Sequence, residues 1–223
     1  MRFIIFGCSH TYGEGITERD LPGFKNTPSK HSWPIYLSRQ YKIRVINYSR
    51  PGASNHYILN AIRNHKWQKN DIAIILFTYP TRYSYYSEEK TCENILPNIL
   101  HAPTREEKRI NNNFYKTFSN YHVEKVNLID VEHAYLFLKY NNIPYVNKFC
   151  AKFTLTKDEL NDEILKDSKF TIQNHANSLF TEEELTGYDG AHFSIDVHKT
   201  WARHLQKFIK PIIDRLQLPD NTQ

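Results

Sequence analysis

The residues of this 223-residue chain that could do chemistry together are a serine near its beginning and an aspartate–histidine pair near its end. Ser9 follows the apolar run Arg2–Phe6 almost directly, and a serine at a strand-to-helix turn can present its hydroxyl at the edge of a sheet. The first N–H groups of the following helix would then face a developing oxyanion. An isolated serine at such a place is more often a helix N-cap.

The second feature is the sequence Asp189-Gly-Ala-His192. A histidine three residues after an aspartate can have its Nδ1–H held by the carboxylate, which leaves Nε2 free to take a proton. A serine beside such a pair could carry out acyl transfer by nucleophilic attack. Asp-Gly is also a common turn, so the pair alone is a weak signal.

Two kinds of pattern predict the elements that must position these residues. Continuous runs of β-branched and aromatic residues, typical of strands buried on both faces of a parallel sheet, lie at Arg2–Phe6, Ile43–Asn47, Ile72–Phe77 and Ile143–Asn147. Helical patterns run from Ser32 to about Gln40, Ser54 to His65, about Phe114 to Tyr140 and about Ile195 to Leu216. Pro211 should kink the last helix or end its first segment.

This alternation predicts an α/β fold: a three-layer doubly wound sandwich with a central, mainly parallel sheet. Ligands bind such sheets beyond the carboxyl ends of the strands, where Ser9 lies. Without repeats or linkers, the chain is expected to be a single domain over 1–223, with loop excursions near 15–31, 100–113 and 150–170. The first two are expected to be loops, and the last is expected to cover the site.

The order of these motifs resembles that of the SGNH (GDSL) hydrolase family. The family's first block is a Gly-Asp-Ser stretch ending in glycine, matched here by Gly7-Cys8-Ser9 and Gly13. Its second block centres on a glycine after the second strand, matched by Gly52, and its last block is Asp-x-x-His. The resemblance spans nearly the whole chain through short motifs, and it implies a flavodoxin-like SGNH hydrolase fold.

The resemblance also implies a role for each matched residue. Ser9 would attack an ester carbonyl, and His192 would act first as general base and then as acid to the leaving alcohol. Asp189 would orient and electrostatically support His192. The backbone N–H groups of Ser9 and Gly52 would bind the oxyanion.

The sequence departs from the family pattern in two blocks. Cys8 replaces the aspartate of the first block, which is not the nucleophile. In the third block the family has Gly-x-Asn-Asp, and the alignment from Asp71 puts Pro80 where the asparagine supplies a side-chain donor. The oxyanion hole is therefore either degraded or completed by one of three side chains that follow the strand, Thr78, Thr81 and Arg82.

Neighbouring residues leave several alternatives open. Asn55 either reaches the site or only caps the helix that begins near Ser54. Arg82 stands among tyrosines where substrate should enter, so it either binds a sugar, a carboxylate or a phosphate, or lies in solvent over packed rings. His10 either touches the leaving group or is an exposed polar neighbour of Ser9. Less favoured are Cys8 as the nucleophile and a metal site built from four side chains, His10, Asp189, His192 and His198.

Composition excludes several classes of protein. Hydrophobic residues make up 40% of the chain and charged residues 24%, which excludes a disordered or collagen-like protein. No apolar run approaches the roughly 18 residues of a transmembrane helix, and the first residues lack a signal-peptide core. Three scattered cysteines fit neither a disulfide framework nor a CxxC metal site. We therefore expect a cytoplasmic protein with no membrane partner, metal or cofactor.

The net charge of +5 is too modest to specify a partner. Four basic residues share one face of the last predicted helix, Lys199, Arg203, Lys207 and Lys210. Such a stripe could bind nucleic acid, but it is more often a solvated face.

The sequence thus predicts a serine esterase or acetylesterase that cleaves an ester, such as an O-acyl group on a carbohydrate, through an acyl-enzyme. An alternative from a different class is a catalytically impaired SGNH-fold module that binds a glycan or a protein, which Pro80 motivates. A third, weaker alternative is an anion- or nucleic-acid-binding protein that uses Arg82 and the basic helix.

Overall fold

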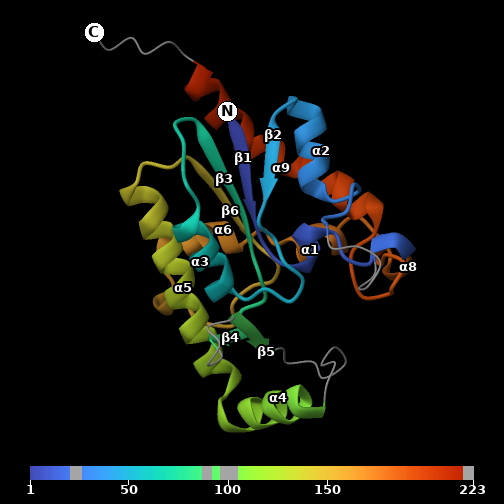
Figure 1. The fold of residues 1–223 in the computed structure, drawn as a ribbon, viewed down its shortest axis with the longest axis vertical. Helices are drawn as coiled ribbons and strands as arrows, with labels where there is room; N and C mark the ends of the chain where they lie inside the picture. Colours follow the sequence, from blue (N-terminus) through green and yellow to red (C-terminus); the bar gives the residue numbers. More distant parts are fainter. Residues whose placement is uncertain (21–26, 87–91, 96–104, 218–223) are drawn as a thin grey trace.

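The computed structural model describes residues 1–20, 27–86, 92–95 and 105–217. Its centre is a four-stranded parallel sheet in the order β2-β1-β3-β6, with helices on both faces (Figure 1). The strands are β1 (Arg2–Phe6), β2 (Arg44–Asn47), β3 (Asp71–Phe77) and β6 (Tyr145–Phe149). The predicted fold class is confirmed: a three-layer α/β sandwich around a parallel sheet.

The two faces of the sheet form two cores. On one face, residues such as Phe3 and Ile5 of β1 pack with α2 (Trp33–Tyr41) and α9 (Ile195–Gln217). On the other face, neighbouring residues such as Ile4 pack with three helices, α3 (Asn55–Asn64), α5 (Asn120–Tyr140) and α6 (Asp162–Ser168). Burial on both faces explains why these strands are continuous apolar runs rather than alternating ones.

The strand order creates a switch point beside β1. The chain passes from β1 to β2 on one side, then crosses back to place β3 on the other side of β1. Phe6 pairs with Ile75, so the carboxyl ends of β1 and β3 open next to each other. Ser9 and Thr78 follow these two ends, which is where a doubly wound sheet forms its ligand site.

The predicted helix from about Phe114 to Tyr140 is confirmed over Asn120–Tyr140, but its predicted start is wrong, because two helices occupy this region. The first, α4 (Arg105–Thr117), begins inside the stretch that was expected to be a loop. Arg, Glu and Lys favour helix even where no apolar period marks it. The second, α5, begins after Ser119, whose Oγ accepts the His122 N–H at 3.2 Å and so starts a new helix.

Helix α9 confirms the predicted span from about Ile195 to Leu216, and it continues through Pro211 to Gln217 rather than ending there. Two further differences concern the strands. Strand β6 begins two residues later than the predicted run at 143–147. A two-stranded antiparallel hairpin of β4 (Tyr83–Tyr86) and β5 (Cys92–Ile95) was not predicted.

The remaining elements are short. They are α1 (Ser9–Tyr12), η1 (Glu18–Asp20), η3 (Lys157–Glu159), α7 (Ile172–Asn177) and α8 (Glu182–Leu185). The segment expected to be an excursion at 150–170 instead contributes Phe153, Leu155 and Ile164 to the core that contains α5. Across the part of the chain that is described, no helix combines the length and the apolar character needed to cross a membrane.

Candidate functional site

Ser9 is the first residue of α1, immediately beyond β1. The N-cap of this short helix is Cys8, so Ser9 is not the cap that an isolated serine would suggest. Gly13 ends the helix in the left-handed conformation, with φ of 81°, and donates its N–H to Ser9 O at 2.7 Å. The Ser9 residue is 2% exposed, and its hydroxyl makes no hydrogen bond to any residue in the described ranges.

The turn that carries Asp189 and His192 packs directly against the segment after Ser9. A Cβ on Gly15 would lie 2.0 Å from Asp189 Oδ2, so only glycine allows the backbone to come this close. Gly15 O also accepts the Asp189 N–H at 3.4 Å. The rings of His10 and His192 lie 5.4 Å apart between centroids. The structure thus brings together two motifs that are far apart in the sequence.

Asp189 holds His192 in the manner that the spacing predicted. Its Oδ2 lies 2.6 Å from His192 Nδ1, and its Oδ1 accepts the N–H groups of Ala191 and His192 at 3.0 and 2.9 Å. Burial raises the pKa of Asp189, but these hydrogen bonds outweigh burial and hold it below its ordinary value. The carboxylate therefore stays ionised near neutral pH and orients the ring.

The other ring nitrogen of His192 lies near Glu14. Glu14 Oε2 lies 3.6 Å from His192 Nε2, and both side chains are largely buried. Within the described residues, no hydrogen bond joins the Ser9 hydroxyl to His192. Glu14 gave no signal in the sequence, because its place near the histidine depends on how two distant segments pack.

Gly52 and Asn55 each carry a hydrogen-bond donor that bonds to no other residue in the described ranges. Gly52 lies in the left-handed region, with φ of 73°, in the loop where Arg50 donates its N–H to Gly7 O at 3.2 Å. Asn55 is fully buried; its Oδ1 accepts the Thr78 N–H at 2.9 Å, and its Nδ2 has no hydrogen-bond partner. Ser54 is the N-cap of α3, since its Oγ accepts the Tyr57 N–H at 3.2 Å. Asn55 therefore does not cap the helix.

The residues after β3 form a connected polar group. Arg82 Nη1 donates to Thr78 Oγ1 at 3.0 Å, and the guanidinium lies 5.0 Å from the centre of the Tyr79 ring. Thr81 contributes its carbonyl, which accepts the Tyr115 hydroxyl at 2.7 Å. Arg82 is thus held by a hydroxyl and an aromatic face rather than standing free in solvent. Pro80 is buried and offers no polar donor.

His10 is not the exposed neighbour of Ser9 that was expected. It is 5% exposed, its Nε2 lies 3.0 Å from the Tyr79 hydroxyl, and its ring packs on Phe193 with centroids 4.5 Å apart. Burial, and then the nearby His192 and Arg82, hold the pKa of His10 well below its ordinary value. His10 is therefore a neutral side chain in the wall of the site.

The arrangement disfavours two weaker alternatives. The contact of Cys8 Sγ with Cys150 Sγ at 3.7 Å lowers the pKa of Cys8, but Cys8 is fully buried and so is poorly placed to attack a substrate. In the portion of the chain that is described, no group of three or more His, Cys, Asp or Glu side chains could hold a metal ion. His198, one of the proposed ligands, instead uses Nδ1 to accept the Trp33 N–H at 3.2 Å.

The basic stripe of α9 is partly neutralised on its own helix. Lys199 pairs with Asp196 at 2.9 Å, and Lys210 pairs with Asp214 at 2.7 Å. The stripe is thus less basic than four unpaired cations would be, which favours a solvated face over a nucleic-acid surface.

No family model matches the chain, and no curated protein matches it in sequence. Solved structures match it in fold. An acetyl xylan esterase (Est2A) from the rumen bacterium Butyrivibrio proteoclasticus is similar with a TM-score of 0.53 at 11% identity, over 96% of this chain and 64% of the esterase. This chain thus spans slightly less than two thirds of that protein.

Two further structures match over nearly their whole length with lower scores. They are a carbohydrate acetylesterase family member from Sinorhizobium meliloti (TM-score 0.46, 10% identity, 96% of this chain and 100% of the other) and a member of the lipolytic G-D-S-L family from Veillonella parvula (0.42, 12%, 94% and 98%). The chain has the fold of the acetyl xylan esterase, which confirms at the level of fold the SGNH resemblance of its sequence.

Proposed function

We propose that the chain is a serine esterase that cleaves an O-acyl ester through an acyl-enzyme. Ser9 is the nucleophile, His192 the general base and acid, and Asp189 the residue that orients His192. The main support is the 2.6 Å contact between Asp189 Oδ2 and His192 Nδ1 beside the Ser9 segment. With Nδ1–H held by the carboxylate, Nε2 is the nitrogen left to take a proton.

The reaction follows from these roles. The Ser9 oxygen attacks the ester carbonyl carbon while its proton passes to His192 Nε2, and the protonated ring then gives that proton to the leaving alcohol. Water repeats the sequence on the acyl-enzyme and releases the acid. For the attack, Ser9 and His192 must come within hydrogen-bond distance. Catalytic hydrogen bonds are often long or poorly aligned before substrate binds, so a small movement of His192 away from Glu14 is part of the proposal.

The proposed oxyanion hole has three donors, the N–H groups of Ser9 and Gly52 and the Nδ2 amide of Asn55. Asn55 takes the place of the family asparagine, whose position in the third block is occupied by Pro80. Its support is a fully buried side chain whose oxygen accepts the Thr78 N–H, while its NH₂ group has no partner in the part of the chain that is described. A donor preorganised in this way needs little reorganisation when the oxyanion forms.

For the substrate we propose an acyl group on a carbohydrate. Tyr79 with Arg82 over its ring offers an aromatic face and a guanidinium next to the proposed nucleophile, a combination suited to a sugar ring with polar substituents. The resemblance in fold to an acetyl xylan esterase agrees with this choice but does not specify the sugar.

One observation favours a second candidate, a catalytically impaired module that binds a glycan or a protein. His192 Nε2 faces Glu14 Oε2 at 3.6 Å, and the described structure has no hydrogen bond from Ser9 to His192. In this alternative the site would bind a ligand without turning it over.

Hydrolysis of p-nitrophenyl acetate and acetylated xylo-oligosaccharide distinguishes the two candidates. The esterase proposal predicts release of acetate by the wild-type protein and its loss in Ser9→Ala and His192→Ala variants that retain the wild-type circular dichroism. A wild-type protein that binds the oligosaccharide without releasing acetate would instead establish the binding module.

A further inference from the structure

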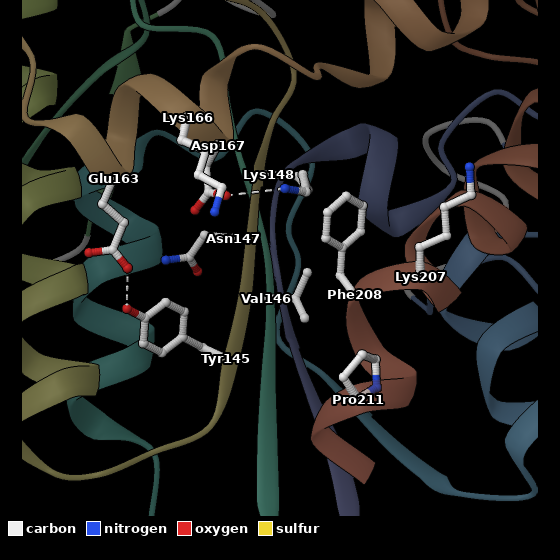
Figure 2. A pocket seen from close by; sticks show the side chains of 10 residues that line it. All are labelled: Tyr145, Val146, Asn147, Lys148, Glu163, Lys166, Asp167, Lys207, Phe208 and Pro211. Atoms are coloured by element: carbon white, nitrogen blue, oxygen red, sulfur yellow. Dashed lines mark hydrogen bonds and ion pairs between the residues drawn. The ribbon is translucent and has the colours of Figure 1, made fainter. Parts of the chain in front are cut away.

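The central sheet has an open edge at β6, away from Ser9. Strand β6 pairs with β3 on one side only, and on the other side Phe149 is bridged to Thr171. Nearer its beginning, β6 has no neighbouring strand among the described residues. Here α6 and α9 flank the edge and leave a cavity of about 360 Å³ (Figure 2). Ligand pockets in proteins have volumes of about 300–1,000 Å³.

The strand offers unpaired backbone groups to this cavity. Ala73 of β3 donates its N–H to Pro144 O at 2.9 Å, and Cys150 donates its N–H to Phe77 O at 2.7 Å. Since hydrogen-bonding groups alternate in direction along a parallel strand, the even-numbered residues of β6 bond to β3. The N–H and C=O groups of Tyr145 and Asn147 therefore face outward, into the open edge.

Asn147 adds an unpartnered amide to the same place. Its residue is 2% exposed and lines the cavity, yet among the described residues neither its Nδ2 nor its Oδ1 has a partner at hydrogen-bond geometry. The neighbouring Tyr135 hydroxyl donates to Asp167 Oδ2 at 2.7 Å; it also interacts with the Asn147 amide, but not at the geometry of a full hydrogen bond. A buried amide is destabilising unless something bonds to it, so this side chain points to a ligand with both a donor and an acceptor.

The charges around the cavity favour an anionic ligand. The two carboxylates are already bonded: Asp167 accepts from Lys148 Nζ at 3.2 Å, and Glu163 accepts from the Tyr145 hydroxyl at 2.5 Å. Lys166 and Lys207 also line the cavity, are exposed, and form no ion pair with a described residue. Lys166 on α6 and Lys207 on α9 are therefore available to attract an anionic ligand.

The wall formed by α9 is partly apolar. Phe208 and Pro211 line it, and Lys148 Nζ lies 4.0 Å from the centre of the Phe208 ring. Figure 2 shows Val146 and Lys148 on the side of Phe208, and Tyr145 and Asn147 on the side of α6. A ligand along the strand would therefore meet an aromatic wall on one side and an amide on the other.

We propose that this cavity binds the carboxyl-terminal end of an extended peptide, which adds to β6 as a short strand. The peptide backbone pairs with the outward groups of Tyr145 and Asn147, and a peptide group satisfies the Asn147 amide. An apolar side chain rests on Phe208, and the terminal carboxylate is attracted by Lys166 and Lys207. Strand addition of this kind draws affinity from main-chain hydrogen bonds and selectivity from side-chain pockets. The site is separate from the proposed esterase centre and does not depend on it.

The test uses the full chain, the peptide N-acetyl-Ala-Ala-Val with a free carboxylate, and nuclear magnetic resonance titration. The proposal predicts that the backbone amide signals of Tyr145 and Asn147 shift with saturation. The C-terminal amide of the same peptide, and a Lys166→Gln/Lys207→Gln double variant, should each bind about tenfold more weakly, as expected for the loss of one charge-assisted contact. Lys210→Gln, on the same helix and paired with Asp214, serves as the matched control and should bind like the wild type.

A second variant separates binding from folding. Asn147→Leu removes the unpartnered amide, so it should raise the melting temperature of the free protein and abolish peptide binding. If that variant does not fold, the lysine variants still decide the outcome. No shift at Tyr145 and Asn147 at millimolar peptide, equal binding of acid and amide, or full competition by acetate alone would each overturn the proposal.

Discussion

Asn55 Oδ1 accepts the Thr78 N–H at 2.9 Å, and this bond connects the start of α3 to the end of β3. It fixes the orientation of the amide, so that Nδ2 is the end left without a partner among the residues the structure describes. Thr78, directly after β3, thus positions Asn55, and Pro80 in the same segment occupies the place where the SGNH pattern has its asparagine.

Asn55→Ala is predicted to lower kcat on p-nitrophenyl acetate by about 10²–10³ with a smaller change in KM, because the lost donor acts mainly in the transition state. Asn55→Asp is the matched variant: it keeps an oxygen for the Thr78 N–H but cannot donate when ionised. It should lose as much activity as the alanine variant. An unchanged kcat in both would remove Asn55 from the oxyanion hole.

Glu14→Gln is predicted to raise kcat several-fold, because the Glu14 side chain 3.6 Å from Nε2 favours a position of the His192 ring away from Ser9. Steady-state kinetics of the purified variant measures this directly. Glu18→Gln, a change of the same type on an exposed residue of η1, is the control. A fall in kcat would show instead that Glu14 supports His192 during turnover.

Asp189 should make stability depend on pH in the acid range. Its pKa is lowered in the folded protein, so its stabilising contribution is present above the unfolded value of about 3.9 and is lost as pH falls through the folded value. Urea unfolding of wild type and Asp189→Asn between pH 6 and about pH 2 gives the comparison. The wild type should lose more free energy of unfolding on acidification than the variant; parallel curves would contradict the assignment.

Substitutions at two glycines test how tightly the Asp189–His192 turn packs against the segment after Ser9. Gly15 and Gly190 have nearly the same positive φ, 67° and 68°, but only at Gly15 would a Cβ strike another residue, Asp189. Gly190→Ala should cost about 1–2 kcal/mol from backbone strain alone. Gly15→Ala should cost more in the same urea measurement, because Asp189 must also move. Equal losses would mean that the turn holding His192 is not packed tightly on the Ser9 segment.

The sequence predicts best those structural features that are determined by residues close together in the chain. The runs at Arg2–Phe6 and Ile72–Phe77 predict β1 and β3 well, since burial on both faces leaves a direct mark on composition. The break between α4 and α5 was missed because Ser119 looks like any polar residue inside a helical pattern, and only its cap bond to His122 shows that a helix starts there.

In the candidate site too, the sequence predicts contacts between near neighbours in the chain but not contacts between distant segments. The bond between Asp189 and His192 spans three residues, so their spacing predicts it. The contact of Glu14 with His192 and the bond of Asn55 to Thr78 join segments that meet only through the sheet, and no spacing encodes them. The sequence left the role of Asn55 open because an asparagine after Ser54 is equally suited to a cap.

The central claim is that Ser9 is an acyl-accepting nucleophile activated by His192. Its most direct test is covalent labelling by a fluorophosphonate ester, followed by peptide mass spectrometry of the wild type and the His192→Ala variant. The account predicts one adduct, on Ser9, formed at least about 10³-fold more slowly without His192. An adduct on Cys8, or no adduct on a folded wild-type protein that also leaves p-nitrophenyl acetate intact, would contradict it.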